Sequence, residues 1–336
     1  MTQATPAAGK RTLGTHSVCP IGLGCMSLSL AYGGQLPDEQ GVEILHRALD
    51  LGYDHLDTAR LYGMGHNETL LGKTLRGLRD RFFLASKTGI YVEGNKRWID
   101  CSPKATRAAC EESLRLLQTD YIDLYYLHRH DDSIPIEEAI EGMAQLVQEG
   151  KIGGIGLSEV SAPTLRRAAA VHPITAVQNE YSLWTRNPEI AVLDACRELG
   201  TTFVAFSPLG RGVLANSVQS PEQISDTDFR KTMPRFLPEN WGHNYGLICQ
   251  FNGIAAEQGV SPAQLALAWV LSRGEHVVAI PGTGNMKHLE ENMARHDWQP
   301  DADVLQRLDQ LINQQTIHGH RYSEAMRANI DSEDFS

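Results

Sequence analysis

The chain of 336 residues carries 30 Lys and Arg against 41 Asp and Glu, which gives a formal net charge of −11 at pH 7. This acidic balance argues against nucleic acids and acidic membranes as partners. Hydrophobic residues make up 42% of the chain and can fill a large core, but no apolar run approaches the roughly 18 residues that a membrane span needs.

The chain begins with residues 1–10, which we expect to be disordered, and residues 11–18, which predict a small hairpin that turns at Gly14. Strands are predicted over residues 19–25, 53–57, 82–87, 121–128, 153–158, 174–178, 201–207 and 277–283. Helical periodicity predicts helices over residues 38–51, 67–75, 102–117, 135–148, 161–171, 189–199, 261–272 and 286–295.

Strands and helices therefore alternate, which indicates a parallel sheet. Two helix starts are marked by a Ser followed by a Pro, at Ser102 and Ser261. No Pro/Gly/Ser-rich or charged linker interrupts the alternation, and barrels of this kind commonly exceed 250 residues as one domain. We predict a single-domain (β/α)8 barrel over residues 11–325, with the hairpin across its bottom.

Two segments depart from the alternation. Residues 209–246, which follow the seventh strand, lack either period and are far longer than an ordinary connection, so we interpret them as a functional lid. After Asp301, an extra helix over residues 304–313 leads into a polar tail, residues 326–336, which we expect to cover the same face as the lid.

Polar residues stand where the predicted strands end. Asp57, Lys87 and His128 each end a strand, and Tyr62 follows Asp57 closely. The carboxyl ends of barrel strands build the active site. A phenol that exchanges a proton needs a nearby cation to stabilise its anion, and Lys87 with its partner Asp57 would supply that cation. The set suits carbonyl reduction.

Two other interpretations are open at this point. The run from His128 to Asp132 invites a metal site, but the other strands end in Ser158, Gln178 and Ser207 rather than in further ligands, so we expect no metal. A G-x-G follows Ile21, yet Ser27 replaces the third glycine of a Rossmann fingerprint, and no Tyr is followed four residues later by Lys.

Several spaced motifs resemble the aldo-keto reductase superfamily in the family's order. They are GLGCMSLSLAYG near the start, DTARLYG, ASKTG, YIDLYYLHR, LVQEGKIGGIGLSEV, AVQNEYSLW, FSPLGRG and IPGTGNMKHLEEN. The resemblance is greatest to the branch whose first strand reads GLGCM, with potassium-channel β-subunits as more distant relatives. It implies that Tyr62 is the general acid, that Lys87 and Asp57 tune it, and that His128 orients the carbonyl.

The resemblance also implies a nicotinamide dinucleotide extended across the barrel top. Ser158 and Gln178 would hold the carboxamide, and Phe206 would stack on the nicotinamide ring. Ser207, Leu209 and Arg211 would line the pyrophosphate. Further cofactor contacts are expected from Gly24, Met26, Pro281, Gly282, Thr283, Lys287, Glu291 and Asn292. Glu159 stands where many relatives have Asn, so its own contact is open.

The adenine end has fewer cations than relatives that prefer the phosphorylated cofactor. After the IPGT turn, Lys287 is a fixed cation, whereas His288 is mostly neutral at pH 7. We therefore expect NADPH as cofactor, with NADH use plausible because the clamp for the 2′-phosphate is weakened.

The substrate is expected to be a small carbonyl compound. Tyr32, Trp98 and Trp184, with Met26, suggest a mostly apolar pocket that accepts aromatic aldehydes. The runner-up function is a redox-sensing regulatory subunit that binds the nicotinamide and turns over slowly. The six cysteines have no C-x-x-C spacing and the amino terminus lacks a secretory signal, so we expect a cytoplasmic protein. The oligomeric state is open.

Overall fold

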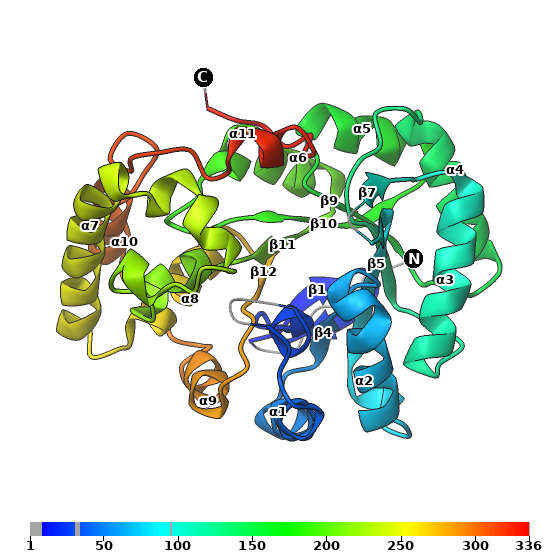
Figure 1. The fold of residues 1–336 in the computed structure, drawn as a ribbon, viewed down its shortest axis with the longest axis horizontal. Coiled ribbons are helices and arrows are strands. Elements are labelled where there is room, and N and C mark those ends of the chain that lie inside the picture. Colours follow the sequence, from blue (N-terminus) through cyan, green and yellow to red (C-terminus); the bar gives the residue numbers. More distant parts are fainter. Residues whose placement is uncertain (1–8, 31–33, 95, 336) are drawn as a thin grey trace.

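Eight parallel strands form the centre of the computed structural model, which describes residues 9–30, 34–94 and 96–335 (Figure 1). In chain order the strands are β3 (Leu23–Gly24), β4 (His55–Asp57), β5 (Phe83–Thr88), β8 (Leu124–Leu127), β9 (Ile155–Ser158), β10 (Ile174–Glu180), β11 (Thr202–Phe206) and β12 (Val277–Ile280). They pair in the order β12-β11-β10-β9-β8-β5-β4-β3. The predicted parallel sheet is confirmed.

Backbone bonds between the first and last strands close the sheet into a barrel. Gly22 N donates to Ala279 O at 2.8 Å, and Gly24 N donates to Pro281 O at 3.2 Å. A Cβ on Gly24 would lie 2.8 Å from Ile280 O, so this close approach requires glycine. The single-domain barrel predicted from the sequence is therefore the observed fold.

Nine helices that follow the predicted ranges surround the strands (Figure 1). They are α1 (Asp38–Leu51), α2 (His66–Thr74), α3 (Pro103–Leu117), α4 (Ile136–Gln148), α5 (Ala162–Val171), α6 (Val192–Leu199), α8 (Pro262–Leu271), α9 (Met286–Ala294) and α10 (Ala302–Leu311). Both predicted N-caps are present: Ser102 accepts from Ala105 N, and Ser261 forms a reciprocal capping box with Gln264.

Alternation along each strand decides which side chains enter the barrel. On β5, Phe83 and Ala85 belong to the interior cluster, so Lys87 also points inward. Ser86 points the other way, and its hydroxyl donates to Glu68 of α2 at 2.6 Å. The same alternation brings the strand-end residues of neighbouring strands into one interior space.

A two-stranded hairpin closes the bottom of the barrel. It consists of β1 (Arg11–Leu13) and β2 (His16–Val18), as the sequence predicted. Leu13 and Val18 join the same interior cluster as Phe83 and Ala85. The barrel is thus filled with side chains from below, and its polar residues gather at the opposite end.

The predicted lid is an ordered, packed segment. It contains four 3-10 turns, η5 (Gly210–Ala215), η6 (Pro221–Gln223), η7 (Phe229–Thr232) and η8 (Pro234–Phe236), and the start of α7 (Pro238–Glu257). Phe236 is 2% exposed and stacks on Trp241 at 5.7 Å between ring centroids. The prediction that residues 209–246 contain no regular structure is therefore wrong at its end, where α7 begins at Pro238. Tertiary contacts stabilise this helix although its sequence has low helix propensity.

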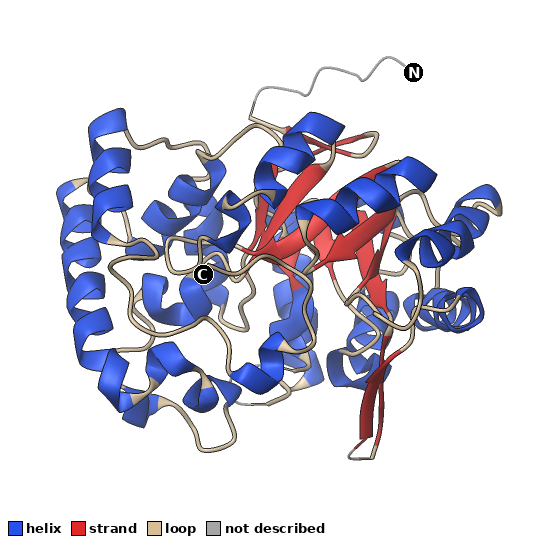
Figure 2. Cartoon of the chain, turned by 90° about the horizontal axis from the view of Figure 1, so that it is seen from above, coloured by secondary structure: helices blue, strands red, loops and turns tan. Residues whose placement is uncertain are grey.

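A second hairpin, which the sequence analysis missed, extends the chain beyond β5. Its strands are β6 (Ile90–Glu93) and β7 (Lys96–Ile99), and it projects from the barrel on the side away from the N-terminal hairpin (Figure 2).

In the part of the chain that the structure describes, every helix is too short or too polar to span a lipid bilayer.

Gly156 offers a test of the packing inside the barrel. It faces Tyr126 across β8 and β9, and a Cβ there would lie 2.2 Å from Cδ1 of the Tyr126 ring. We expect Gly156→Ala to lower the free energy of unfolding by about 1–3 kcal/mol, because the ring has to shift in a filled core. Denaturant unfolding measures this change.

Gly246→Ala is the matched control. Gly246 is exposed within α7, and a Cβ there meets nothing within 4 Å. This substitution should raise the free energy of unfolding by about 0.5–1 kcal/mol. Equal stability of Gly156→Ala and the wild type would contradict the packing described for Tyr126.

Candidate active site

The four residues predicted to transfer a proton lie together at the carboxyl end of the strands. Asp57 ends β4, Lys87 lies near the end of β5, and His128 directly follows β8. Tyr62 begins a short 3-10 turn, η2 (Tyr62–Gly65), beyond β4. The side chains of all four are buried.

The centre of this site is a buried ion pair between Asp57 and Lys87. The Lys87 ammonium donates to Asp57 Oδ1 and, at 2.9 Å, to the carbonyl of Thr58. The second carboxylate oxygen of Asp57 accepts from Gln178 Nε2 at 2.8 Å. Because both oxygens of the carboxylate are bonded, its orientation and that of the ammonium are fixed.

The phenol of Tyr62 is the third partner of the ammonium. Lys87 Nζ lies 3.3 Å from Tyr62 Oη and 5.1 Å from the centroid of the ring. The turn that carries Tyr62 contains Gly63 and Met64 in left-handed conformations, at φ 58° and 56°. Such a conformation is uncommon for a residue other than glycine and is maintained by the surrounding structure.

The charges of the site determine which groups are protonated. Burial alone would lower the pKa of Lys87, but Asp57 and Tyr62 raise it above its ordinary value. Burial raises the pKa of Tyr62, and Lys87 offsets part of this increase. The phenol is therefore protonated at neutral pH, and the ammonium beside it is ready to stabilise the phenolate that forms when the proton leaves.

His128 is a neutral imidazole at the edge of this cluster. Burial, together with the charges of Arg129, Lys87 and Arg97, holds the pKa of His128 well below its ordinary value. Its ring meets the Tyr62 ring edge-on at 5.9 Å between centroids. Nδ1 is buried and has no hydrogen-bond partner among the described residues. The imidazole is thus placed to act through hydrogen bonds rather than through charge.

The two residues predicted to hold a carboxamide lie beside the tetrad. Ser158 ends β9, and its hydroxyl accepts from Arg129 Nη1 at 3.3 Å. Gln178 lies on β10 and already donates to Asp57. The role of Gln178 in orienting Asp57 was missed by sequence reasoning, because the two residues are 121 positions apart and no local signal connects them.

The residues predicted near the pyrophosphate follow β11. Phe206 ends the strand, and Ser207 and Arg211 adopt left-handed conformations at φ 49° and 58°. The Arg211 guanidinium is buried, pairs with Glu180 and donates to Tyr322 Oη at 2.9 Å. The side chain of Arg211 is therefore engaged with Tyr322 near the carboxyl terminus, and Leu209 caps the turn η5.

The backbones around Gly24 and Gly282 approach each other where the barrel closes. A Cβ on Gly282 would lie 2.9 Å from Ser27 Oγ and 3.0 Å from Gly24 O. Met26 lies in the adjacent turn η1 (Cys25–Leu28), and Pro281 and Thr283 flank Gly282. Glycine at both positions allows the two main chains to pack this closely.

Helix α9 carries the residues predicted for the adenine end. Asn285 caps the helix by accepting from Lys287 N at 2.9 Å, and the Lys287 side chain is exposed. Glu291 is half-buried. Asn292 is buried, and its Oδ1 lacks a hydrogen bond to the described residues. A buried acceptor without a protein partner and an exposed cation on the same helix fit a nucleotide, whose base carries a donor amine and whose phosphates are anionic.

The three aromatic residues predicted to line a substrate pocket are not seen to form one pocket among the described residues. Trp98 stacks on Tyr91 at 5.6 Å between ring centroids. Trp184 is 2% exposed and meets the edge of the Phe236 ring. Tyr32 lies outside the described residues. The contribution of these three side chains to substrate binding stays a prediction.

The carboxyl-terminal segment covers the same end of the barrel, as expected. Glu159, buried and at φ 55°, forms an ion pair with Arg321 at 3.0 Å and accepts from Ser332 Oγ at 2.6 Å. Burial alone would raise the pKa of Glu159, but the charges of Arg321 and Arg129 hold it below its ordinary value. Glu159, whose contact the sequence left open, therefore anchors the tail.

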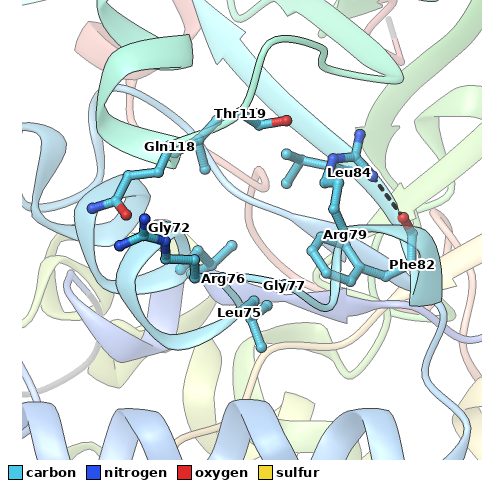
Figure 3. Close-up of a pocket in the computed structure, with 11 residues that line it drawn as sticks. Gly72, Leu75, Arg76, Gly77, Arg79, Phe82, Leu84, Gln118 and Thr119 are labelled. Carbon is cyan, nitrogen blue, oxygen red and sulfur yellow. Dashed lines mark hydrogen bonds between the residues drawn. The ribbon is translucent and has the colours of Figure 1, made fainter.

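Two hollows lie away from this site. A pocket of about 40 Å³ sits between the ends of α2 and α3 and is lined by Leu75, Gln118 and Arg79, which donates to Phe82 O at 2.9 Å (Figure 3). It has room for a few water molecules at most. A wider cleft of about 520 Å³ lies at the barrel bottom, against His16 and Asp123. Neither touches the tetrad.

Comparisons with known proteins agree with this geometry. The model of the aldo/keto reductase family matches residues 20–313. A protein of Glycine max called "Probable aldo-keto reductase 1" is 41% identical over 324 residues, which are 96% of this chain and 93% of the relative.

Two solved structures share the fold. The glycerol dehydrogenase of Gluconobacter oxydans is 27% identical with a TM-score of 0.84, over 91% of this chain and 95% of that one. An aldo/keto reductase of Klebsiella pneumoniae, solved in complex with NADP and acetate, is 30% identical with a TM-score of 0.72, over 94% and 99% of the two chains.

The buried anchor of the tail generates a stability prediction. Arg321→Met should lower the free energy of unfolding by about 3–5 kcal/mol, because it leaves the Glu159 carboxylate buried and unpaired. The double variant Arg321→Met/Glu159→Leu removes both charges and should be more stable than the single variant. Denaturant unfolding of both proteins checks this order.

Arg327→Met serves as the control within the tail. Arg327 pairs with Asp334 at 3.5 Å, and both side chains are more than one-third exposed. Its loss should change the free energy of unfolding by less than about 1 kcal/mol. If Arg321→Met were as mild as Arg327→Met, the Glu159 anchor would not hold the tail.

Proposed function

Because the chain belongs to the aldo/keto reductase family and is thus an oxidoreductase, we propose that it reduces small aldehydes or ketones reversibly, with Tyr62 as the proton donor. The observation that carries this proposal is the contact of 3.3 Å between Lys87 Nζ and Tyr62 Oη in a buried site. A protonated phenol next to a fixed ammonium is the donor that carbonyl reduction requires.

The proposed cofactor is NADPH, which supplies the hydride when bound. The complex of the Klebsiella relative with NADP supports this choice. Ser158 and Gln178 would orient the carboxamide, and Phe206 would offer its ring face to the nicotinamide. The closely approaching main chains at Gly24 and Gly282, and the buried acceptor of Asn292, would receive the rest of the nucleotide.

The catalytic roles follow from the charges. As negative charge develops on the carbonyl oxygen, Tyr62 transfers its proton to it. Lys87, held by Asp57, stabilises the phenolate that remains. His128, which is neutral, offers a hydrogen bond that orients the carbonyl. Alcohol oxidation uses the same residues in reverse, with Tyr62 as the base.

The proposal includes a cytoplasmic location. The six cysteines are free thiols and five of them are buried, in accord with a reducing compartment.

Tyr62→Phe tests the proton donor directly. We expect the rate of reduction of a reactive aromatic aldehyde to fall by about 10²–10⁴-fold, because the phenol that protonates the oxygen is missing. Initial rates of NADPH consumption measure the effect. Tyr91→Phe is the matched control, since the Tyr91 hydroxyl donates to Ala105 O on α3 and takes no part in the tetrad.

The outcomes separate two functions. A large loss in Tyr62→Phe with wild-type rates in Tyr91→Phe supports the reductase. Tight cofactor binding without turnover by the wild type would instead favour the redox-sensing regulatory subunit.

The weak cluster of cations at α9 predicts the cofactor preference. Lys287 and His288 are both exposed, and only the former carries a fixed charge. We expect comparable kcat/KM values for NADPH and NADH. A preference for NADPH by about three or more orders of magnitude, equivalent to about 4 kcal/mol, would contradict a weakened 2′-phosphate clamp.

A further inference from the structure

Two arginines next to the tetrad have no role in the proposed mechanism. Arg97 lies on the hairpin strand β7, and Arg129 directly follows His128. Neither guanidinium forms an ion pair with a carboxylate of the described residues.

The hairpin is tied to the loop that carries His128 and Arg129. Asp100 N donates to Gly89 O at 3.0 Å, which closes the base of the hairpin. Cys101 Sγ donates to Arg129 O at 3.2 Å. A Cβ on Gly89 would lie 3.9 Å from His128 N. The hairpin therefore rises directly beside the tetrad.

The two faces of the hairpin have different environments. Tyr91 and Trp98 form a cross-strand pair, and Tyr91 Oη donates to Ala105 O at 3.1 Å, so this face looks toward α3. Lys96 belongs to the same face, with Nζ 5.5 Å from the centroid of the Trp98 ring. Because side chains alternate along a strand, Arg97 lies on the opposite face, away from α3.

From this face, Arg97 lies close enough to His128 for its charge to affect the imidazole. This charge helps to hold the pKa of His128 below its ordinary value. Arg97 is exposed in part, yet its partial burial lowers its pKa, and the charge of Arg129 lowers it further. The two guanidiniums therefore repel each other in the free protein, and an anion between them would relieve this repulsion.

Arg129 is held where such an anion would meet the substrate. Its Nη1 donates to His128 O at 2.5 Å and to Ser158 Oγ at 3.3 Å. Its Nε and Nη2 donate no hydrogen bond within the described part of the chain. The charge of Arg129 helps to lower the pKa of the buried Glu159. The Glu159 carboxylate is nevertheless already bonded to Arg321 and Ser332.

We propose that Arg97 and Arg129 bind a carboxylate carried by the carbonyl substrate. The inference rests on the proposed reductase function and narrows its substrates to aldehydo or keto acids. Guanidinium groups present paired donors that match a carboxylate, and such charge-assisted bonds are stronger than neutral ones. The carbonyl carbon would then lie toward Tyr62 and His128, with the carboxylate toward the hairpin.

A pair of substrates of similar shape tests the site. 4-Carboxybenzaldehyde carries the anion, and 4-formylbenzamide replaces it with an uncharged amide. The measured quantity is the ratio of kcat/KM for the acid to kcat/KM for the amide. We expect a ratio above one for the wild type and a fall of about tenfold in Arg97→Ala, since one charge-assisted hydrogen bond is lost. Arg97→Glu should lower the ratio further.

Lys96→Ala is the matched control, because it removes the same charge from the adjacent position but from the face toward α3. It should leave the ratio at the wild-type value. An equal fall in Lys96→Ala and Arg97→Ala would show that general attraction, and not a site at Arg97, selects the acid. An unchanged ratio in Arg97→Ala would also overturn the proposal.

Calorimetric binding of terephthalate to the protein with NADP⁺ separates this proposal from the reductase function. Terephthalate cannot be reduced, so its affinity does not depend on turnover. Weaker binding to Arg97→Ala than to Lys96→Ala would support the carboxylate site even if the wild type reduced neither aldehyde, a result that would reject the reductase. Equal binding to both variants would reject the site and leave the reductase standing.

Discussion

The buried ion pair of Asp57 and Lys87 is the interaction on which the candidate active site depends. Charges removed from water are unfavourable unless their partners and remaining hydrogen bonds are supplied. Here Gln178 and the Thr58 carbonyl supply them. The pair keeps one ammonium in place beside Tyr62 Oη. In the proposed reaction, this ammonium allows the buried phenol to act as an acid.

The barrel provides this arrangement by geometry. Inward-pointing residues of neighbouring parallel strands meet at their carboxyl ends, whereas apolar side chains and the N-terminal hairpin fill the space below. Ion pairs between residues distant in the sequence surround the strand ends. Glu159 binds Arg321 of the tail, and Glu180 pairs with Arg211 beside Tyr322. The tail is thus fixed over the end of the barrel where the tetrad lies.

Local signals in the sequence predicted the barrel, and they predicted that four polar residues, Asp57, Tyr62, Lys87 and His128, lie at its carboxyl end. The serine caps at Ser102 and Ser261 and the polar strand ends lie within a few residues of the structure they define. In contrast, α7 contains Gly242, Gly246 and Gly253, and its helix is stabilised by distant contacts such as that of Asn244 with His318 O at 2.9 Å. No local sequence pattern predicts such a helix.

Long-range polar contacts were equally beyond prediction. Glu159 and Arg321 are 162 positions apart, and neither lies in a motif that indicates an ion pair. The face of the hairpin on which Arg97 lies follows from the Tyr91 and Trp98 pairing, which depends on a turn that the sequence analysis did not recognise. The sequence therefore did not predict that Arg97 and Arg129 lie close together.

The most direct test of the account is the ionisation of Tyr62 itself. Tyrosine labelled with ¹³C at Cζ reports the pKa of each phenol by NMR, and the Tyr62→Phe spectrum assigns the signal. In the double variant Asp57→Asn/Lys87→Met, which removes the ion pair without leaving a buried unpaired charge, we expect the pKa of Tyr62 to be higher than in the wild type. An unchanged or lower pKa would show that Lys87 does not stabilise the phenolate and would contradict the central claim.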